Sequence, residues 1–506
     1  MTEGRVHDGV PDRGPDRLSA RGAIALLTDD FAELPYPARD SAPDGPLAWH
    51  GYDASRARAA ERTGEEESVV CGTAAVEGTR AVLIAFEFGF LGGSLGERTG
   101  DRLETAYTYA RARRLPVVAL VATGGSRMQE GMLALTQLQR VARQSALTRE
   151  AGLPQLAILR DPTTGGGWAT LGAGADVTLA LPGAQVGFAG SRVRPPDADP
   201  AAYTAEAQVA AGSVDAVVHP EELRQTLALW LRLLSGPTAP DAPQRDAGAH
   251  HVRLRQVGAP SHSRTADDRR PDPALPPEHP AAPLPFALGA QELPRTGWDA
   301  VQRARSSRRP RAEAYLAAYF THRVALSGDR CGGTDPDGML CGFGEHEGRT
   351  VAYAAQTGAA TRPAGFRTAA RLIRLADRLG IPVLTLVDTP GAANDAEAER
   401  QGVGAAIADL FGAVAAARVP ITTLLIGEGG SGGALALAAP GNTWATPDSY
   451  FSVIGPEMAA AILKRGAGEV ESTADELRIR PQDLVALGVV RGVVGVPGVP
   501  GGSTRP

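Results

Sequence analysis

Two glycine-rich segments of this chain have the composition of sites that hold developing negative charge. The first, GGSRMQEG, covers residues 124–131 and the second, GEGGSGGA, covers residues 427–434; each follows a run of aliphatic and β-branched residues. A strand that ends in such a turn and leads into a helix leaves backbone N–H groups without partners, and the helix dipole favours an anion there. Glycine pairs also serve as ordinary tight turns. Because the pattern occurs in two separate blocks, we interpret the segments as two sites that stabilise two oxyanions.

The elements around these segments repeat along the chain. A strand, a glycine turn and a helix follow one another four times, with the strands predicted at 117–121, 156–159, 383–387 and 421–426. Helices predicted at 103–114 and 371–379 precede two of these units. The repeated order predicts an α/β fold in which parallel strands end in glycine turns that feed helix N-termini.

The length and the proline distribution divide the chain into two folded domains. A chain of 506 residues exceeds the range of one compact core. Dense proline and charge in the middle of the chain predict an extended linker. The predicted regions are an N-terminal segment (1–66), a first domain (67–235), the linker (236–297) and a second domain (298–497). Within the N-terminal segment, the aliphatic stretch at 23–34 predicts a docking helix.

Composition excludes several classes of partner and site. A formal net charge of -6 and a pI of about 5.9 give no electrostatic case for a nucleic-acid or anionic-membrane partner. We expect no export signal and no membrane span, because no apolar stretch is long enough. The three cysteines, Cys71, Cys331 and Cys341, form no CxxC pair, so we expect no disulfide framework and no metal site. These features predict a cytoplasmic protein.

An ordered set of motifs resembles a known enzyme family. Before the linker lie FEFGFLGGSLGERTGDRL (86–103), ATGGSRMQEG (122–131), LRDPTTGG (159–166) and VGFAGSRV (186–193), which resemble the β subunit of bacterial acetyl-CoA carboxylase carboxyltransferase. After the linker lie SGDR (327–330), GFRTAARL (365–372), LVDTPGA (386–392), GEGGSGGALAL (427–437) and YFSVIGPEMAAAIL (450–463), which resemble the α subunit. The chain is therefore similar to fused β and α subunits of a biotin-dependent acyl-CoA carboxylase carboxyltransferase.

The resemblance implies two domains of the crotonase-like superfamily, each built from repeated ββα units. The first domain would bind acyl-CoA and the second carboxybiotin, with the active site between domains of different protomers in a homodimer. The predicted linker, with a random-coil reach of about 40 Å, also permits pairing within one chain.

The implied reaction transfers a carboxyl group from carboxybiotin to the α carbon of a short acyl-CoA, such as acetyl-CoA or propionyl-CoA, through an enolate. Biotin would arrive on a separate biotin carboxyl carrier protein that a biotin carboxylase loads. Backbone amides would stabilise both oxyanions. This mechanism needs no nucleophilic side chain, and the sequence shows no Ser/His/Asp constellation.

Under this resemblance the glycine turns supply the candidate site residues. The candidates for the enolate oxygen are Gly124, Gly125 and Ser126, with Gly166 and Gly167 contributing the second donor. The candidates for the biotin oxygen are Gly432, Gly433 and Ala434, with Gly391 and Ala392 as the other wall. Further substrate-binding candidates are Gly92, Gly93, Arg127 and Arg192.

Charged side chains in the motifs have competing interpretations. Arg127 would contact the CoA phosphates or pair with Glu130 in a structural ion pair. Arg192 and Arg194 lie in a loop after a predicted strand and are candidate phosphate contacts. Asp388 ends a predicted strand, where a carboxylate serves as a cap or turn acceptor.

Three departures from the family pattern keep other functions open. Cys71 is the only cysteine before the linker, so the zinc ribbon usual in the β subunit cannot form. Thr357 stands where the α subunit usually has lysine, and residues 393–395 stand where it usually has Tyr-Pro-Gly. One alternative is a biotin-independent decarboxylase of malonyl-CoA or a malonyl thioester. The other is a non-catalytic paralogue that acts as an assembly subunit, against which the intact glycine turns argue.

Overall fold

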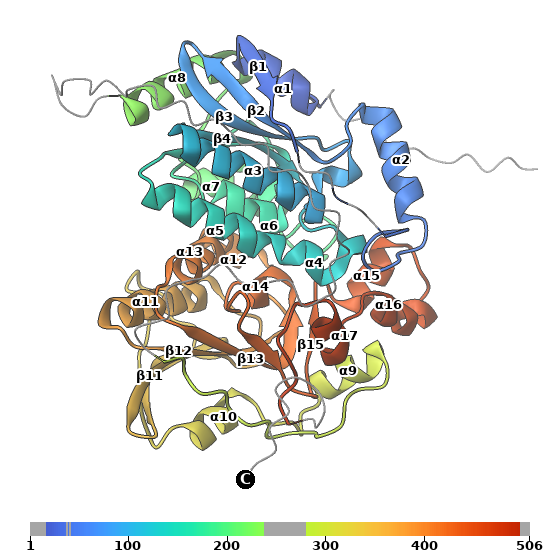
Figure 1. Cartoon of the computed structure of the whole chain (residues 1–506), viewed down its shortest axis with the longest axis vertical. Coiled ribbons are helices and arrows are strands. Elements are labelled where there is room, and N and C mark those ends of the chain that lie inside the picture. The colour runs from blue at the N-terminus through green and yellow to red at the C-terminus, as the bar shows by residue number, and fades with distance from the viewer. Residues whose placement is uncertain (1–16, 37–38, 40–41, 237–279, 496–506) are drawn as a thin grey trace, which may run out of the picture.

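The structure is a computed structural model that describes residues 17–36, 39, 42–236 and 280–495. Figure 1 shows two sheets with a layer of helices between them, and this layer contains helices from both halves of the chain. One hydrophobic core runs through this central layer and includes buried residues of both halves, among them Leu103 and Ile407. Smaller cores cover the outer face of each sheet. The two halves therefore pack against each other through their helices.

The first sheet combines an antiparallel edge with a parallel centre. Its strands are β1 (Asp30–Glu33), β2 (Val69–Val76), β3 (Thr79–Phe86), β4 (Val117–Thr123), β5 (Gln155–Thr164), β6 (Val177–Ala180), β7 (Val186–Gly187) and β8 (Ala216–Val217). They lie in the order β1-β2-β3-β4-β5-β6-β8, with β7 paired to β5. Strands β1, β2 and β3 pair antiparallel, and all the later pairs are parallel.

The second sheet repeats this topology. Its strands are β9 (His322–Ala325), β10 (Met339–His346), β11 (Arg349–Gln356), β12 (Val383–Thr389), β13 (Ile421–Gly430), β14 (Thr443–Ala445) and β15 (Tyr450–Ser452). They lie in the order β14-β13-β12-β11-β10-β9, with β15 paired to β13. Here too the first three strands pair antiparallel and the others parallel. The duplicated α/β arrangement confirms the fold class predicted from the repeated turns.

The helices flank both sheets, and crossover connections between the parallel strands run through several of them. In the first half they are α1 (Ala20–Leu27), α2 (Tyr52–Thr63), η1 (Leu91–Gly93), α3 (Glu97–Arg113), η2 (Met128–Glu130), α4 (Gly131–Leu135), α5 (Gln137–Glu150), α6 (Gly165–Gly167), the π-helical η3 (Trp168–Gly172), η4 (Pro200–Tyr203), α7 (Ala205–Ala210) and α8 (Pro220–Ser235). In the second half they are α9 (Gly297–Arg305), α10 (Ala312–Tyr319), α11 (Pro363–Leu379), α12 (Ala396–Arg400), α13 (Val403–Ala416), α14 (Ser431–Leu435), α15 (Pro456–Ile462), η5 (Ala467–Glu469), α16 (Val470–Glu476) and α17 (Pro481–Ala486).

The same irregularity occurs at the end of a central strand in both sheets. The register between β4 and β5 shifts between Val121 and Thr123, and the register between β12 and β13 shifts between Val387 and Thr389. Each shift lets the neighbouring strand continue to pair beyond the predicted end, with β7 in one sheet and β15 in the other. Bulges of this kind redirect the chain at functional sites. The turns at residues 124–126 and 390–392 follow these shifts directly, whereas residues 427–430 of the second glycine segment form the end of β13 rather than a turn.

The observed elements cross two of the predicted boundaries. The N-terminal segment contains α1 and also β1, which pairs with β2, so this segment belongs to the first sheet rather than standing apart. Helix α1 buries Ile24 and Leu27 against the outer face of that sheet. At the other boundary, residues from 280 onward already pack on the second domain, where Ala282 is buried. Residues 237–279 of the predicted linker lie outside the described residues.

The two halves meet where α5 and η3 of the first pack on α13 of the second. Gln139 Nε2 donates a hydrogen bond to Ala438 O at 2.8 Å, and Arg143 Nη1 donates one to Ala415 O at 2.8 Å. The indole of Trp168 is fully buried against Gly404, where a Cβ atom would lie 2.0 Å from Nε1. Only glycine fits at that position of the helix.

Replacing Gly404 by alanine is expected to destabilise the contact between the halves by about 1–3 kcal/mol, because the rigid indole cannot move away from the added methyl group. The matched control is Gly412→Ala on the same helix, where a Cβ atom meets nothing within 4 Å. Alanine there is expected to stabilise by about 0.5–1 kcal/mol, because it lowers the entropy cost of forming the helix. Thermal unfolding of the two variants measures the difference. Equal melting temperatures for both would contradict the assigned contact.

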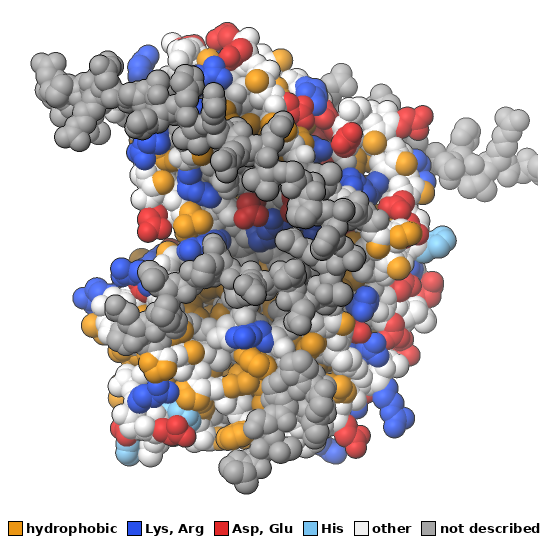
Figure 2. Space-filling view, in the orientation of Figure 1, with side chains coloured by type: hydrophobic (Ala, Val, Ile, Leu, Met, Phe, Trp, Pro, Cys, Tyr) orange, Lys and Arg blue, Asp and Glu red, His pale blue; other side chains and the backbone are white. Residues whose placement is uncertain are grey.

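The side of the molecule shown in Figure 2 carries no large patch of a single charge. Figure 2 shows acidic and basic side chains interspersed over that side of the molecule. Within the described ranges, no helix is both long enough and apolar enough to cross a membrane. Cys71 and Cys341 are buried thiols and Cys331 is an exposed one.

Candidate functional site

The first predicted glycine turn packs against the glycine turn that follows the neighbouring strand. Gly125 has a φ of 104°, which side chains rarely adopt, and it lies directly against Gly165 and Gly166. A Cβ atom at Gly125 would lie 3.7 Å from Gly165 Cα and 3.9 Å from Gly166 N. The structure thus brings together the two segments that were expected to supply the two donors of one site.

The hydrogen bonds of this turn show which amides are free. Gly124 N donates to Gly92 O at 2.9 Å, and Gly125 N donates to Thr123 Oγ1 at 3.0 Å. The N–H groups of Ser126 and Gly166 have no acceptor among the described residues. The Ser126 Oγ is also buried without a hydrogen-bond partner in the described part of the chain. We refer to the amides of Ser126 and Gly166 as the first amide pair.

The second domain repeats this arrangement. Gly391 N donates to Thr389 Oγ1 at 3.1 Å, as Gly125 does to Thr123. The N–H groups of Ala392 and Gly432 have no acceptor within the described ranges. A Cβ atom at Gly433 would lie 2.4 Å from Ala392 N, so the two turns are in contact. We refer to the amides of Ala392 and Gly432 as the second amide pair.

Strained backbone holds the second amide pair in place. Ser431 has a φ of 52°, at the position where the first domain has Gly165 with a φ of 65°. A side chain in this region costs energy, and such strain concentrates at functional sites. Gln356, fully buried at the end of β11, donates from Nε2 to Gly433 O at 3.1 Å. Sequence reasoning missed Gln356, because a glutamine at a strand end carries no distinctive signal.

Both amide pairs border the same side chain within one chain. Leu138, on α5 and fully buried, lies 2.5 Å from the position of a Cβ atom at Gly166 and 3.7 Å from that of a Cβ atom at Gly432. The Phe188 ring, which follows β7, lies 3.6 Å from the same Gly432 position. The two turns of one chain therefore lie close to the same apolar side chain, Leu138. Their convergence depends on non-local packing that a sequence pattern does not carry.

Other contacts at this junction link loops of the two domains. Tyr203 OH donates to Asn394 O at 2.8 Å, and Asn394 Nδ2 donates to Val193 O at 2.8 Å. Asn394 lies within residues 393–395, one of the departures from the family pattern. Thr357, a second departure, donates a hydrogen bond from its hydroxyl to Asp337 O. Asn394 and Thr357 therefore both have hydrogen-bond partners, and the contacts of Asn394 join the two domains.

A buried carboxylate of the second domain also reaches into the first. Glu399, on α12, is fully buried, and its Oε1 accepts a hydrogen bond from Ala189 N at 3.0 Å. Burial raises the pKa of the Glu399 carboxyl to about 7, while the N–H groups of Ala189 and Phe188 and the charge of Arg194 act in the opposite direction. Glu399 carries no distinctive sequence signal, because an acidic residue in a short helix is normally solvent-exposed.

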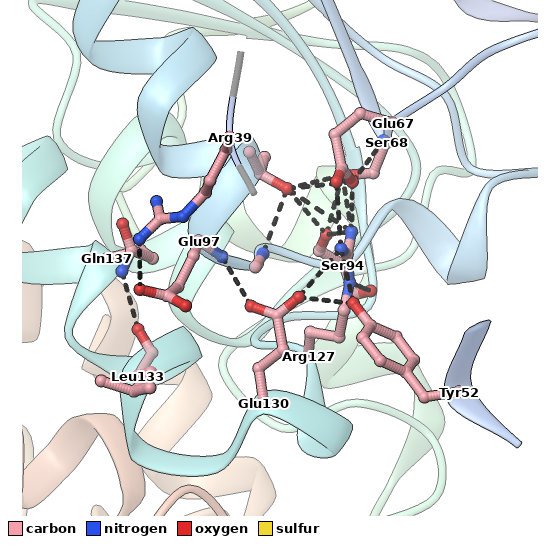
Figure 3. Close-up of polar contacts among 12 residues, drawn as sticks. Arg39, Tyr52, Glu67, Ser68, Ser94, Glu97, Arg127, Glu130, Leu133 and Gln137 are labelled. Carbon is pink, nitrogen blue, oxygen red and sulfur yellow. Dashed lines mark hydrogen bonds and ion pairs between the residues drawn. The ribbon is translucent and has the colours of Figure 1, made fainter. Parts of the chain in front are cut away.

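Arg127, the residue after Ser126, forms the centre of a buried network of polar side chains (Figure 3). Its guanidinium is 1% exposed and pairs with Glu67, also 1% exposed, and with Glu130 at 3.3 Å. It also donates to Ser94 O at 2.8 Å and to Tyr52 OH at 3.1 Å. Of the two interpretations of Arg127, the structure shows the ion pair. These contacts tie the turn after β4 to the loop that precedes α3.

Burial acts to raise the pKa of the Glu67 carboxyl, but Arg127 and the Ser68 N–H outweigh it and hold that pKa at about 2. We expect Arg127→Met to lower the free energy of unfolding by about 3–5 kcal/mol, because Glu67 is left buried without a counter-ion. Urea unfolding measures this loss. The control is Arg192→Met, whose side chain is exposed. An equal small effect in both variants would show that Arg127 is not the stabilising partner of Glu67.

The remaining predicted residues lie around these groups. Gly92 accepts the bond from Gly124, and Gly93 N donates to Phe90 O at 3.0 Å. Gly167 is buried directly after Gly166, and Ala434 is buried two residues after Gly432. Arg192 is exposed, but Arg194 stacks on the Tyr203 ring at 3.9 Å.

Asp388 is a buried ion-pair partner rather than a simple turn acceptor. Its Oδ1 lies 2.6 Å from Arg309 Nη2 and accepts the Glu428 N–H at 3.1 Å. The cation thus comes from the segment between α9 and α10, far away in sequence. Asp388 joins that segment to the ends of β12 and β13, beside the second amide pair.

Comparison with known proteins matches each half of the chain to a carboxyltransferase family model. Residues 292–505 match a family model described as acetyl co-enzyme A carboxylase carboxyltransferase-like. Residues 48–217 match the carboxyl transferase domain. Together the two matches include both sheets apart from β1.

Curated relatives match the chain across both of its halves. The acetyl-coenzyme A carboxylase carboxyl transferase subunits beta/alpha of Saccharopolyspora erythraea is 38% identical over 462 residues, which are 88% of this chain and 74% of that protein. The protein of the same name from Salinispora arenicola is 37% identical over 512 residues, covering 97% and 84% of the two chains. A solved structure of the transcarboxylase 12S hexamer with hydrolysed methylmalonyl-coenzyme A covers 94% of this chain and 86% of its own, at 19% identity and a TM-score of 0.37.

Proposed function

The chain belongs to the carboxyltransferase family of acyl-CoA carboxylases, and we propose that its first amide pair binds the thioester oxygen of a short acyl-CoA while its second amide pair binds the ureido oxygen of biotin. The family transfers a carboxyl group from carboxybiotin to acyl-CoA, so the chain is a transferase. The roles of individual residues within that reaction are the new part of the proposal.

The observation that carries the proposal is the duplicated pair of free amides, one pair at the turns of each domain. Each pair offers two N–H groups without acceptors in the described chain, which fits an anionic oxygen. When bound, biotin supplies the carboxyl group and a ureido anion able to accept a proton. The first amide pair would stabilise the enolate oxygen, which carries more charge than the ground-state thioester. Backbone donors already held by turns need no reorganisation at that moment.

The arrangement also explains why no side-chain nucleophile is needed. The described residues contribute fixed backbone dipoles at both turns. Arg127 and Gln356 act indirectly, by fixing the loops that carry the first and second amide pairs. This interpretation assigns no chemical step to Glu130, which accepts the Glu97 N–H at 2.6 Å within the buried network.

Substrate and partners follow from the same proposal. We expect acetyl-CoA as an acyl substrate, because the relatives are named for it. We expect biotin on a separate carrier protein loaded by a biotin carboxylase, acyl-CoA as the small-molecule partner, and a homodimer. We also expect the reaction to take place in the cytoplasm.

The test of this function is the dependence of malonyl-CoA turnover on biotin. We expect the purified protein to convert malonyl-CoA to acetyl-CoA only when free biotin or a biotinylated carrier is supplied, as measured by chromatography of the CoA esters. Full-rate conversion without biotin would contradict the proposal and indicate a biotin-independent decarboxylase. No turnover by the folded protein under either condition would indicate a non-catalytic paralogue.

A further inference from the structure

The direction of the free Ser126 amide is set within its own peptide unit. Gly125 O and Ser126 N–H belong to one planar trans peptide, so they point in opposite directions. Gly125 O accepts a hydrogen bond from Leu95 N at 2.9 Å, and Arg127 N donates to Leu95 O at 2.8 Å. Leu95 is thus bonded on both sides of Ser126, and the Ser126 N–H points away from it. A movement of Leu95 would turn this amide.

Arg127 and Glu130 hold the segment around Leu95, as Figure 3 shows. Arg127 Nη2 donates to Ser94 O at 2.8 Å, and Arg127 Nε donates to Ser94 Oγ at 3.1 Å. Glu130 Oε2 accepts the Glu97 N–H at 2.6 Å, at the start of α3, where the helix dipole favours a carboxylate. The chain before and after Leu95 therefore depends on one guanidinium and one carboxylate.

Tyr52, on α2 of the N-terminal segment, joins these two groups. It is 2% exposed, and its hydroxyl donates to Glu130 Oε1 and accepts from Arg127 Nη1 at 3.1 Å. Glu67 takes the closer ion pair with Arg127, which leaves Glu130 with the longer one at 3.3 Å. The Tyr52 hydroxyl supplies the hydrogen bond that a buried carboxylate needs when it shares its counter-ion. Without this hydroxyl, Arg127 would move toward Glu130 and away from Ser94.

The loop before α2 is folded in a way that holds Tyr52 in this place. Asp44 and Ala48 have φ values of 53° and 52°, which side chains rarely adopt. The Asp44 carboxylate accepts hydrogen bonds from Gly51 N at 3.2 Å and from Asp53 N at 3.0 Å, on both sides of Tyr52. Backbone strain persists only where surrounding contacts impose it, and it concentrates at functional sites.

We propose that Tyr52 is a positioning residue for the enolate donor, which keeps Arg127 bonded to Ser94 and so fixes the direction of the Ser126 N–H. The proposal rests on the function proposed above and goes beyond it, because it gives the N-terminal segment a part in the activity. Tyr52 acts only through other residues. Its role concerns the first amide pair and requires nothing of the second.

The first test measures how firmly Leu95 is held. In full-length protein with Tyr52→Phe, we expect hydrogen exchange at the Leu95 and Arg127 amides to accelerate roughly 10-fold, because a hydrogen bond to a buried charge is lost from their support. The control is Tyr36→Phe, which removes a hydroxyl of the same segment that bonds to Cys71 O at 2.9 Å and Cys71 N at 2.7 Å. It should leave both amides unchanged. Mass spectrometry of the exchanged peptides measures both positions, and unchanged exchange in Tyr52→Phe would overturn the proposal.

The second test separates positioning from a merely structural role. We expect Tyr52→Phe to lower kcat of biotin-dependent malonyl-CoA turnover roughly 10-fold with KM little changed, because a misdirected amide matters most for the enolate. Tyr36→Phe should keep its kcat, although it too loses hydrogen bonds. A fall in melting temperature with unchanged kcat in Tyr52→Phe would overturn the proposal. If the unsubstituted protein shows no turnover, the proposed function fails, and the exchange results still decide whether Tyr52 holds Leu95.

Discussion

Gly432→Pro is expected to lower kcat/KM for biotin-dependent carboxyl transfer roughly 100- to 1000-fold, the usual loss when one oxyanion donor is removed. The substitution deletes the Gly432 N–H, which has no acceptor among the described residues. No internal hydrogen bond of the described fold is lost with it. Proline is tolerated in the first turn of a helix, because the N–H groups there have no intrahelical partner. The effect on activity should therefore far exceed the effect on stability.

The matched control for this experiment is Gly432→Ala. A Cβ atom at Gly432 would lie 3.6 Å from Phe188 Cζ and 3.7 Å from Leu138 Cδ1, both ordinary contact distances. Alanine keeps the N–H and adds the same first carbon as proline, so its activity should stay close to that of the unsubstituted protein. Acyl-CoA affinity, measured by calorimetry, should be unchanged in both variants, since the first amide pair is intact. Equal losses of kcat/KM in the two variants would show that space, and not the amide, matters at Gly432.

The strands and turns of this protein could be predicted because their signals are local. Aliphatic runs closed by glycine pairs placed β4, β5, β12 and β13 correctly, and the helices before β4 and β12 were found by their periodicity. The predicted ends of β5 and β13 were too early, because pairing with β7 and β15 extends both strands through residues that favour turns. Pairing with a strand that lies later in the chain overrides local propensity.

The candidate site was predicted at the level of segments rather than atoms. Gly124 and Gly125 were expected to donate to an oxyanion, but their N–H groups already bond to Gly92 O and Thr123 Oγ1. Gly124 loses its free N–H to Gly92, which lies in a loop that comes much earlier in the chain. Glu399 was missed because the groups that bind it lie in the other domain. Non-local contacts of this kind leave no pattern in a short stretch of sequence.

Mixing two inactive variants is expected to restore about half of the normal activity, because the family resemblance places each working site between the first domain of one protomer and the second domain of its partner. Ser126→Pro removes a free amide of the first pair and Gly432→Pro one of the second, since neither N–H has an acceptor within the described ranges. A mixed dimer then contains one site with two intact pairs and one site with two defective pairs. The variants should be co-expressed with different affinity tags, and hetero-oligomers isolated through both tags should be assayed for biotin-dependent malonyl-CoA turnover. If both pairs of a site instead came from one chain, every protomer in the mixture would keep one defective pair in its own site, and no activity would return. That result would contradict a site shared between protomers.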